Sequence, residues 1–145
     1  MMIRTRRGIA VVAMAASALM VGATAANAAS GTWSSSGKTG VHAQGTWKTE
    51  YSKLYISGYV KDTACDGHAV SLKITFSEYY AAGLYGKYRT ETVTNNGGCG
   101  SSKSFSYNTY KPGKTILVNV SECIVDGGLG SIDSCTGSNV INTKV

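Results

Sequence analysis

Apolar and polar residues alternate with a period of two in several segments that follow Trp47. Successive side chains of a β-strand point to opposite faces of a sheet, so this alternation predicts strands with one buried face. Further runs of strand-forming residues cover 85–93, 103–107, 115–125 and 139–145. The alternating apolar positions of the first two segments are Leu54, Ile56, Gly58 and Val60, followed by Val70, Leu72, Ile74 and Phe76.

Turn-forming residues separate these segments. Asp66-Gly67, the Asn-Asn-Gly-Gly run at 95–98 and Pro112-Gly113 each favour a tight reversal of the chain. A series of roughly six to eight short strands without a long helix is typical of an antiparallel β-sandwich. We therefore predict an all-β fold, either immunoglobulin-like or jelly-roll-like, with a small barrel as the alternative.

The first 28 residues have the composition of a secretory signal peptide. Arg4, Arg6 and Arg7 precede an acid-free run of apolar and small residues at 9–23, and Ala-Asn-Ala at 26–28 matches a cleavage site. We therefore expect residues 1–28 to be removed and the mature protein to be secreted. No other apolar run approaches the ~20 residues that a membrane span requires, so no membrane partner is expected.

Four cysteines follow the predicted signal, and an even number in a small exported chain predicts two disulfides. Cys123 and Cys135 flank a glycine-rich turn, so we pair them with each other and pair Cys65 with Cys99. The alternative is a four-cysteine metal site, but no pair has the short spacing of such sites. No metal or cofactor is expected.

The charge distribution argues against a nucleic-acid partner. Without the three leader arginines, the 14 basic side chains become 11 against 8 acidic ones, a net charge of +3. Arg89 is the one arginine that remains, and the lysines are scattered rather than clustered into a stripe that could follow a phosphate backbone.

Residues 29–45 are rich in serine, glycine and threonine, which predicts a flexible N-terminal arm before a sandwich domain at 46–145. A Gly-Thr-Trp tripeptide at 31–33 recurs at 45–47. Because tryptophan is a frequent anchor at protein interfaces, this region supplies the candidate partner-binding residues, namely Trp33, Lys38, Val41 and Trp47.

Tyrosines provide a second candidate surface. Tyr51, Tyr55 and Tyr59 are predicted to share the face of the first long strand that is opposite its apolar positions. Exposed tyrosine rings on a rigid sheet suit sugar stacking or a protein interface. The alternative is that they only pair across strands and favour strand formation.

Catalytic residues are sparse in this chain. His42 and His68 are its two histidines, and no G-x-S-x-G segment is present to position a nucleophilic serine. We therefore expect no enzymatic activity. The loop at 125–134, braced by the predicted Cys123–Cys135 bridge, makes a secreted peptidase inhibitor one alternative function.

Three segments carry a resemblance to a known group of proteins. They are Asp-Thr-Ala-Cys-Asp-Gly-His at 62–68 followed by Val-Ser-Leu-Lys, Lys-Ser-Phe-Ser at 103–106, and the closing loop between Cys123 and Cys135. Together with the arginine-led signal, they resemble the small secreted β-sandwich proteins of streptomycetes, which are actinobacteria. Within that group, the chain is similar to the adaptor subunits of umbrella toxin particles.

The resemblance implies that the arm docks into a lectin-like subunit and that the protein joins this subunit to a long repeat-containing toxin chain. The leading hypothesis is therefore a secreted, non-enzymatic adaptor of an antibacterial toxin particle. The first alternative is a sandwich that binds carbohydrate or cell wall through Tyr55, Tyr59 and Trp47, and the second is the peptidase inhibitor.

Overall fold

The computed structural model describes residues 28–35, 37–125 and 132–145, and eight β-strands cover most of them. The strands are β1 (Ser30–Ser35), β2 (Val41–Glu50), β3 (Lys53–Asp62), β4 (Ala69–Ala81), β5 (Leu84–Asn95), β6 (Ser102–Tyr110), β7 (Thr115–Val125) and β8 (Ile132–Lys144). No membrane-spanning helix is found in this part of the chain.

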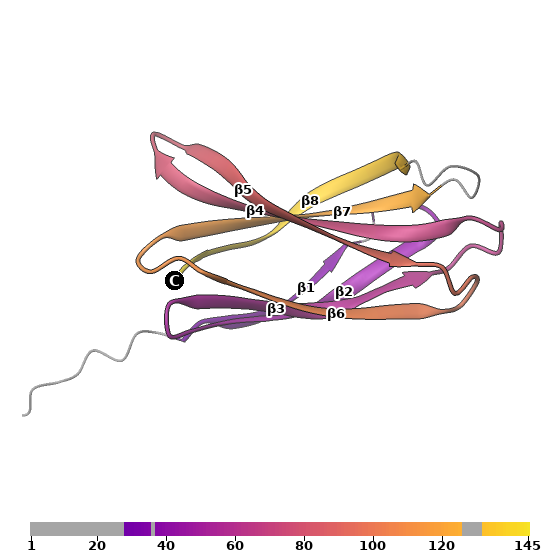
Figure 1. The fold of residues 1–145 in the computed structure, drawn as a ribbon, viewed down its shortest axis with the longest axis horizontal. Helices are drawn as coiled ribbons and strands as arrows, with labels where there is room; N and C mark the ends of the chain where they lie inside the picture. Colours follow the sequence, from indigo (N-terminus) through magenta and orange to yellow (C-terminus); the bar gives the residue numbers. More distant parts are fainter. Residues whose placement is uncertain (1–27, 36, 126–131) are drawn as a thin grey trace, which may run out of the picture.

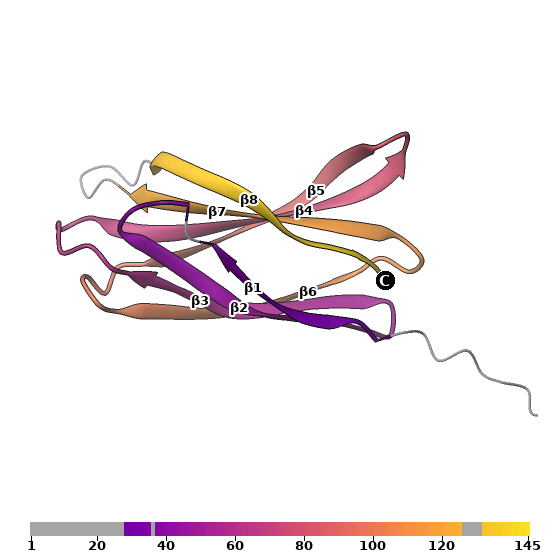
Figure 2. The same ribbon diagram turned by 180° about the vertical axis from the view of Figure 1, so that it is seen from behind.

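The strands form two antiparallel sheets that pack face to face (Figures 1 and 2). The first sheet has the order β1-β2-β3-β6, and the second has the order β5-β4-β7-β8. The predicted antiparallel sandwich is confirmed, and so are both disulfides, Cys65–Cys99 and Cys123–Cys135. Two disulfides are consistent with an oxidising, extracellular environment.

The core lies between the sheets and is built from the alternating apolar positions. Because every second side chain of a strand points inward, each central strand contributes a row of three or more apolar groups. The fully buried ones include Leu54, Ile56 and Val60 from β3, Leu72, Ile74 and Phe76 from β4, and Ile116, Val118 and Val120 from β7.

The segment predicted as a flexible arm is part of the sandwich, and that prediction is wrong. β1 pairs with β2 from Ser30↔Lys48 to Ser35↔Ala43. Even Ala29 is held, because Thr49 N–H donates to its carbonyl at 2.7 Å. Serine and threonine on an edge strand resemble a linker in composition, but their backbone groups here complete the first sheet. The sandwich domain therefore begins near residue 30 rather than at residue 46.

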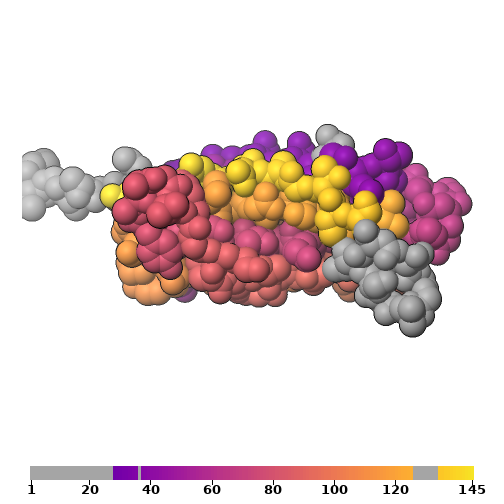
Figure 3. Space-filling model, turned by 90° about the horizontal axis from the view of Figure 1, so that it is seen from above, coloured from indigo at the N-terminus to yellow at the C-terminus, as the bar shows by residue number. Residues whose placement is uncertain are grey.

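The two ends of the sandwich differ in chemistry. At one end, Cys65–Cys99 joins the β3–β4 loop to the β5–β6 loop, and Cys123–Cys135 links directly paired residues of β7 and β8. The β4–β5 hairpin is at the opposite end, where it bends away from the first sheet (Figure 1), and it forms a knob in the surface view (Figure 3). Cross-links and projecting residues are therefore separated by the length of the molecule.

Candidate functional site

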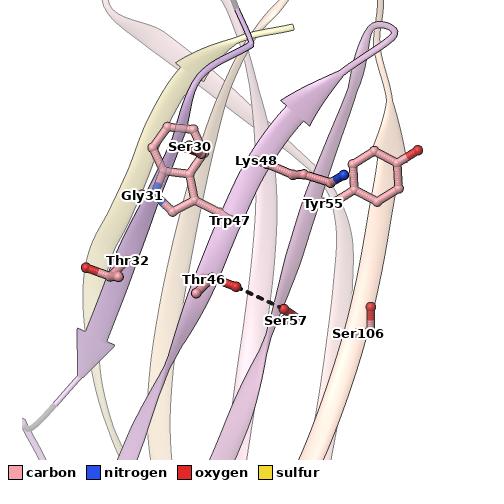
Figure 4. Close-up of a pocket in the computed structure, with 9 residues that line it drawn as sticks. All are labelled: Ser30, Gly31, Thr32, Thr46, Trp47, Lys48, Tyr55, Ser57 and Ser106. Atoms are coloured by element: carbon pink, nitrogen blue, oxygen red, sulfur yellow. Dashed lines mark hydrogen bonds between the residues drawn. The ribbon is translucent and has the colours of Figure 1, made fainter.

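The outward face of the first sheet carries a row of small hydroxyl side chains across all four strands. Thr32 pairs with Thr46, Thr46 with Ser57, and Ser57 with Ser106. Figure 4 shows these residues on one face, with the Thr46 and Ser57 hydroxyls 3.2 Å apart. We call these four residues the hydroxyl row. Each hydroxyl both donates and accepts hydrogen bonds, so the row is suited to a ligand rich in the same groups.

Two half-buried tyrosines stand on either side of the hydroxyl row. Tyr55 and Tyr59 lie on the same face of β3, four residues apart and therefore roughly 13 Å from each other along the strand. The smaller Ser57 lies between them, so the rings flank a depression. Both tyrosines lie where the alternation predicted.

A polar side chain lies next to each of the two tyrosine rings. Lys48 Nζ is 5.3 Å from the centroid of Tyr55, and this ammonium also bonds Glu50 at 2.6 Å. That hydrogen bond raises the pKa of Lys48 above its ordinary value of 10.5, so the side chain remains cationic. On the other side, His42 meets the edge of Tyr59 at a centroid distance of 6.4 Å.

The depression consists of two open hollows that share the hydroxyl row. The hollow beside Tyr55 has a volume of about 570 Å³, and the one beside Tyr59 has a volume of about 640 Å³. Thr32, Thr46 and Ser57 line both. Each volume is within the range of small-ligand sites, and an open face can also accept one stretch of a longer chain.

The inner side of the same sheet is packed around one buried indole. Trp33 pairs with Gly45 across β1 and β2, and Gly45 pairs with Gly58 across β2 and β3. With two side chains missing, the indole of Trp33 lies across the sheet and its ring centroid comes within 5.9 Å of that of Phe105 on β6. A Cβ on Gly58 would be only 2.8 Å from Cζ2 of Trp33.

Trp33 also anchors the backbone beneath the hydroxyl row. Its indole Nε1–H donates to the carbonyl of Ser57 at 3.3 Å, and only 4 % of the residue is exposed. Trp33 was predicted to bind a partner, but it supports the surface from inside the core. Val41 is buried as well, so neither side chain is accessible to a partner.

The other two residues of the predicted arm site are also engaged within the protein. The Lys38 amide donates to the Glu122 carboxylate at 3.0 Å, and its ammonium bonds the Ser134 hydroxyl. Trp47 is partly buried against the core, with its indole over Gly31. Trp33, Lys38, Val41 and Trp47 therefore do not form one exposed surface.

Tyr51 does not join the tyrosine face. It occupies the two-residue turn between β2 and β3, where Tyr51 and Ser52 have φ values of 50° and 59°. The ring is 81 % exposed at the end of the sandwich. A turn without glycine is hard to recognise in a sequence, and for that reason the predicted strand face extended too far.

The sequence interpretation missed the hydroxyl row itself. Its members belong to the same alternation that placed Tyr55 and Tyr59 outward, so the signal was present in β3. β1 and the first half of β2 were assigned to an arm, however, and the pairing that aligns Thr32 and Thr46 with Ser57 was not foreseen.

The outer face of the first sheet combines several kinds of polar group with aromatic rings. It presents hydroxyls, an amide, a lysine and two aromatic rings. Within residues 28–35, 37–125 and 132–145, no group of three or more His, Cys, Asp or Glu side chains is placed to hold a metal ion. The fold and this face together define a class: a two-disulfide β-sandwich with an open polar and aromatic surface on one sheet. No family model, curated protein or solved structure matches the chain.

Proposed function

We propose that this protein is a secreted, non-enzymatic module that binds saccharide chains on the outer face of its first sheet. One observation carries the proposal: a row of hydroxyls crosses four strands between two tyrosine rings on an open, depressed surface. Sugar rings have an apolar face that packs on an aromatic ring and a rim of hydroxyls that needs polar partners. Both kinds of contact are available here.

The rigidity of the surface supports the same proposal. The hydroxyl row is carried by strands rather than loops, and the Trp33 indole bonds the Ser57 carbonyl beneath it. A ligand that binds a preformed surface loses less free energy to ordering of the protein. Because the hollows are open, the proposed ligand is an extended polymer such as a cell-wall or storage glycan.

The test is retention of the purified mature protein on insoluble chitin, cellulose and peptidoglycan. Tyr55→Ala and Tyr59→Ala should each weaken retention by about tenfold, because each removes a ring-sized apolar contact. Tyr51→Ala is the matched control, since its ring lies in the β2–β3 turn away from the face. Lack of retention on all three polymers, or equal loss in Tyr51→Ala, would refute the proposal.

A second variant tests the hydroxyls separately from the rings. Thr46→Val keeps the shape of the side chain and removes the hydroxyl that lies 3.2 Å from that of Ser57. Thr46 is exposed, so thermal unfolding should be nearly unchanged while glycan retention falls. A parallel fall in stability would instead assign Thr46 a structural role.

The adaptor and inhibitor functions stay predictions. The adaptor hypothesis relied on a free arm at 29–45, and most of that segment is paired in the first sheet. The inhibitor hypothesis relied on the loop at 125–134, of which residues 126–131 lie outside the described residues. Neither hypothesis has a surface in the described residues that compares with the hydroxyl row.

A further inference from the structure

One end of the sandwich, opposite the disulfides, gathers the exposed large apolar side chains of the described residues. They come from the β2–β3 turn, the β4–β5 hairpin and the end of β6, which are all at this end, with the hairpin bent away from the β2–β3 turn (Figures 1 and 2). We call this surface the aromatic end. Its members are Tyr51, Tyr79, Tyr80, Leu84, Tyr85 and Tyr110.

The β4–β5 hairpin forms the projecting part of the aromatic end. The pairing of β4 with β7 stops at Glu78↔Ile116, and beyond that point β4 pairs only with β5. The hairpin closes with the pair Ala81↔Leu84 around a two-residue turn. Both turn residues have positive φ, 50° at Ala82 and 80° at Gly83, as the tightest hairpin turns require.

Apolar groups cover both faces of this hairpin. Tyr79 and Tyr85 pair on one face, with ring centroids 5.3 Å apart. Tyr80 lies on the opposite face, over Gly86, where an added Cβ would be 2.4 Å from its ring. Leu84 is 68 % exposed next to the turn, and residues 79–86 contain no charged side chain.

Lysines surround the base of the hairpin and its neighbours. Six lie in the turns or within three residues of the strand ends at this end of the sandwich, against two glutamates, which gives a local side-chain charge of +4. Both glutamates are already paired: Glu50 with Lys48, and Glu78 with Lys111 at 3.1 Å and Lys114 at 3.2 Å. The six lysines are Lys48, Lys53, Lys87, Lys111, Lys114 and Lys144.

We propose that the aromatic end binds the surface of an anionic phospholipid bilayer, with the tip of the β4–β5 hairpin inserted among the head groups. Tyrosine is favoured at the membrane interface, where its apolar ring packs among the lipids and its hydroxyl group stays in contact with water. The lysines, set back from the tip, would meet anionic head groups. Peripheral contact of this kind needs no spanning segment.

The shape of the hairpin favours a bilayer over a protein partner or a second copy of this chain. A partner with a flat surface would cover one face of the hairpin, whereas lipid surrounds both, and both are apolar. Beyond Glu78, the outer edges of β4 and β5 pair with no other described strand, so their backbone groups would meet the polar head groups and water rather than the acyl chains.

The test is co-sedimentation of the mature protein with two kinds of vesicle, phosphatidylcholine alone and an equimolar mixture of phosphatidylcholine and phosphatidylglycerol. The mixed vesicles should bind the protein, and added salt should weaken that binding because it screens the lysines. Leu84→Ser should reduce partitioning by about tenfold, since it removes one inserted side chain. Leu84 is exposed, so the variant should unfold at the wild-type temperature.

Tyr59→Ser provides the matched control and separates this proposal from glycan binding. Its ring lies on the outer face of β3, so the variant should keep vesicle binding while glycan retention falls. Absence of binding to the mixed vesicles, or equal binding by Leu84→Ser, would overturn the proposal. A Leu84-dependent dimer in sedimentation equilibrium, without vesicle binding, would instead assign the aromatic end to a second copy of the chain.

Discussion

Glu122 allows a direct test of how the two sheets are fastened together. It lies on β7 in the second sheet, on the inward face that also carries Val118 and Val120, and it is completely buried. Its two carboxylate oxygens accept hydrogen bonds from the first sheet and its β1–β2 connection. The Ala43 amide donates to Oε1 at 3.1 Å, and the Lys38 amide donates to Oε2 at 3.0 Å.

The substitution Glu122→Gln keeps the size of the side chain and removes its charge. The amide oxygen of the new glutamine can still accept a hydrogen bond from one of the two backbone N–H groups. Its NH2 group would then face the other N–H, and two donors cannot form a hydrogen bond with each other. Loss of one charge-assisted bond with a buried donor left unsatisfied costs about 3 kcal/mol. A domain of this size has a stability of roughly 5–15 kcal/mol, so the loss is a large fraction of the total.

Equilibrium unfolding in urea under non-reducing conditions measures this loss. With an m value of about 1–3 kcal/mol/M, a loss of about 3 kcal/mol should lower the midpoint by roughly 1–3 M. Glu91→Gln is the matched control, because Glu91 forms a partly exposed pair with Arg89 and should cost at most about 1 kcal/mol. A Glu122→Gln midpoint equal to that of the control would refute the assigned role of the buried carboxylate.

Two more predictions concern packing and pH. Gly58→Ala should lower the free energy of unfolding by about 3 kcal/mol in the same urea assay, because its Cβ would be 2.3 Å from the backbone carbonyl oxygen of Gln44 and 2.8 Å from the Trp33 ring. An unchanged midpoint would contradict this close packing. The hydrogen bond from Lys111, together with Lys114, lowers the pKa of Glu78 below its ordinary value of 4.5. Ionised Glu78 therefore stabilises the fold above that pH, and the stabilisation is lost as the pH falls through the lowered pKa. The melting temperature should depend less on acidic pH in Glu78→Gln than in wild type, and identical profiles would contradict this.

The alternation of apolar residues was sufficient to predict the two-sheet core. At Ile116, Val118 and Val120 the inward face follows the pattern without interruption, and Glu122 continues it as a buried carboxylate. The cysteine pairing was also predictable from the glycine-rich composition between Cys123 and Cys135, and the structure places these two residues opposite each other on adjacent strands.

The first two strands could not be predicted in the same way, because their side chains are mostly small and polar. Gly45 is inward-facing and leaves space for Trp33, which comes from the neighbouring strand. The alternation of apolar residues along one strand does not show that a tryptophan from the neighbouring strand fills the space beside it. Thr32, the member of the hydroxyl row on β1, was therefore hidden in a segment with the composition of a linker.

The sequence shows only part of the aromatic end, as the neighbouring tyrosines Tyr79, Tyr80 and Tyr85. Tyr51, Tyr80 and Tyr110 are far apart in the sequence and come together only when three connections meet at one end of the sandwich. The local signal at 79–86 is a run of tyrosine, alanine and glycine, which is compatible with several conformations. Which turns share an end depends on strand order, and strand order requires the fold.

The position of Trp33 gives the protein an intrinsic optical probe. Its indole is shielded from water and bonded to the carbonyl of Ser57, the residue at the centre of the hydroxyl row. A ligand that shifts β3 even slightly would change the surroundings of this indole and with them its fluorescence. The chain contains one other tryptophan, Trp47, so replacing Trp47 with phenylalanine would leave a single emitter directly behind the candidate surface. The binding of a ligand to this surface could then be followed in solution by tryptophan fluorescence, without an added label.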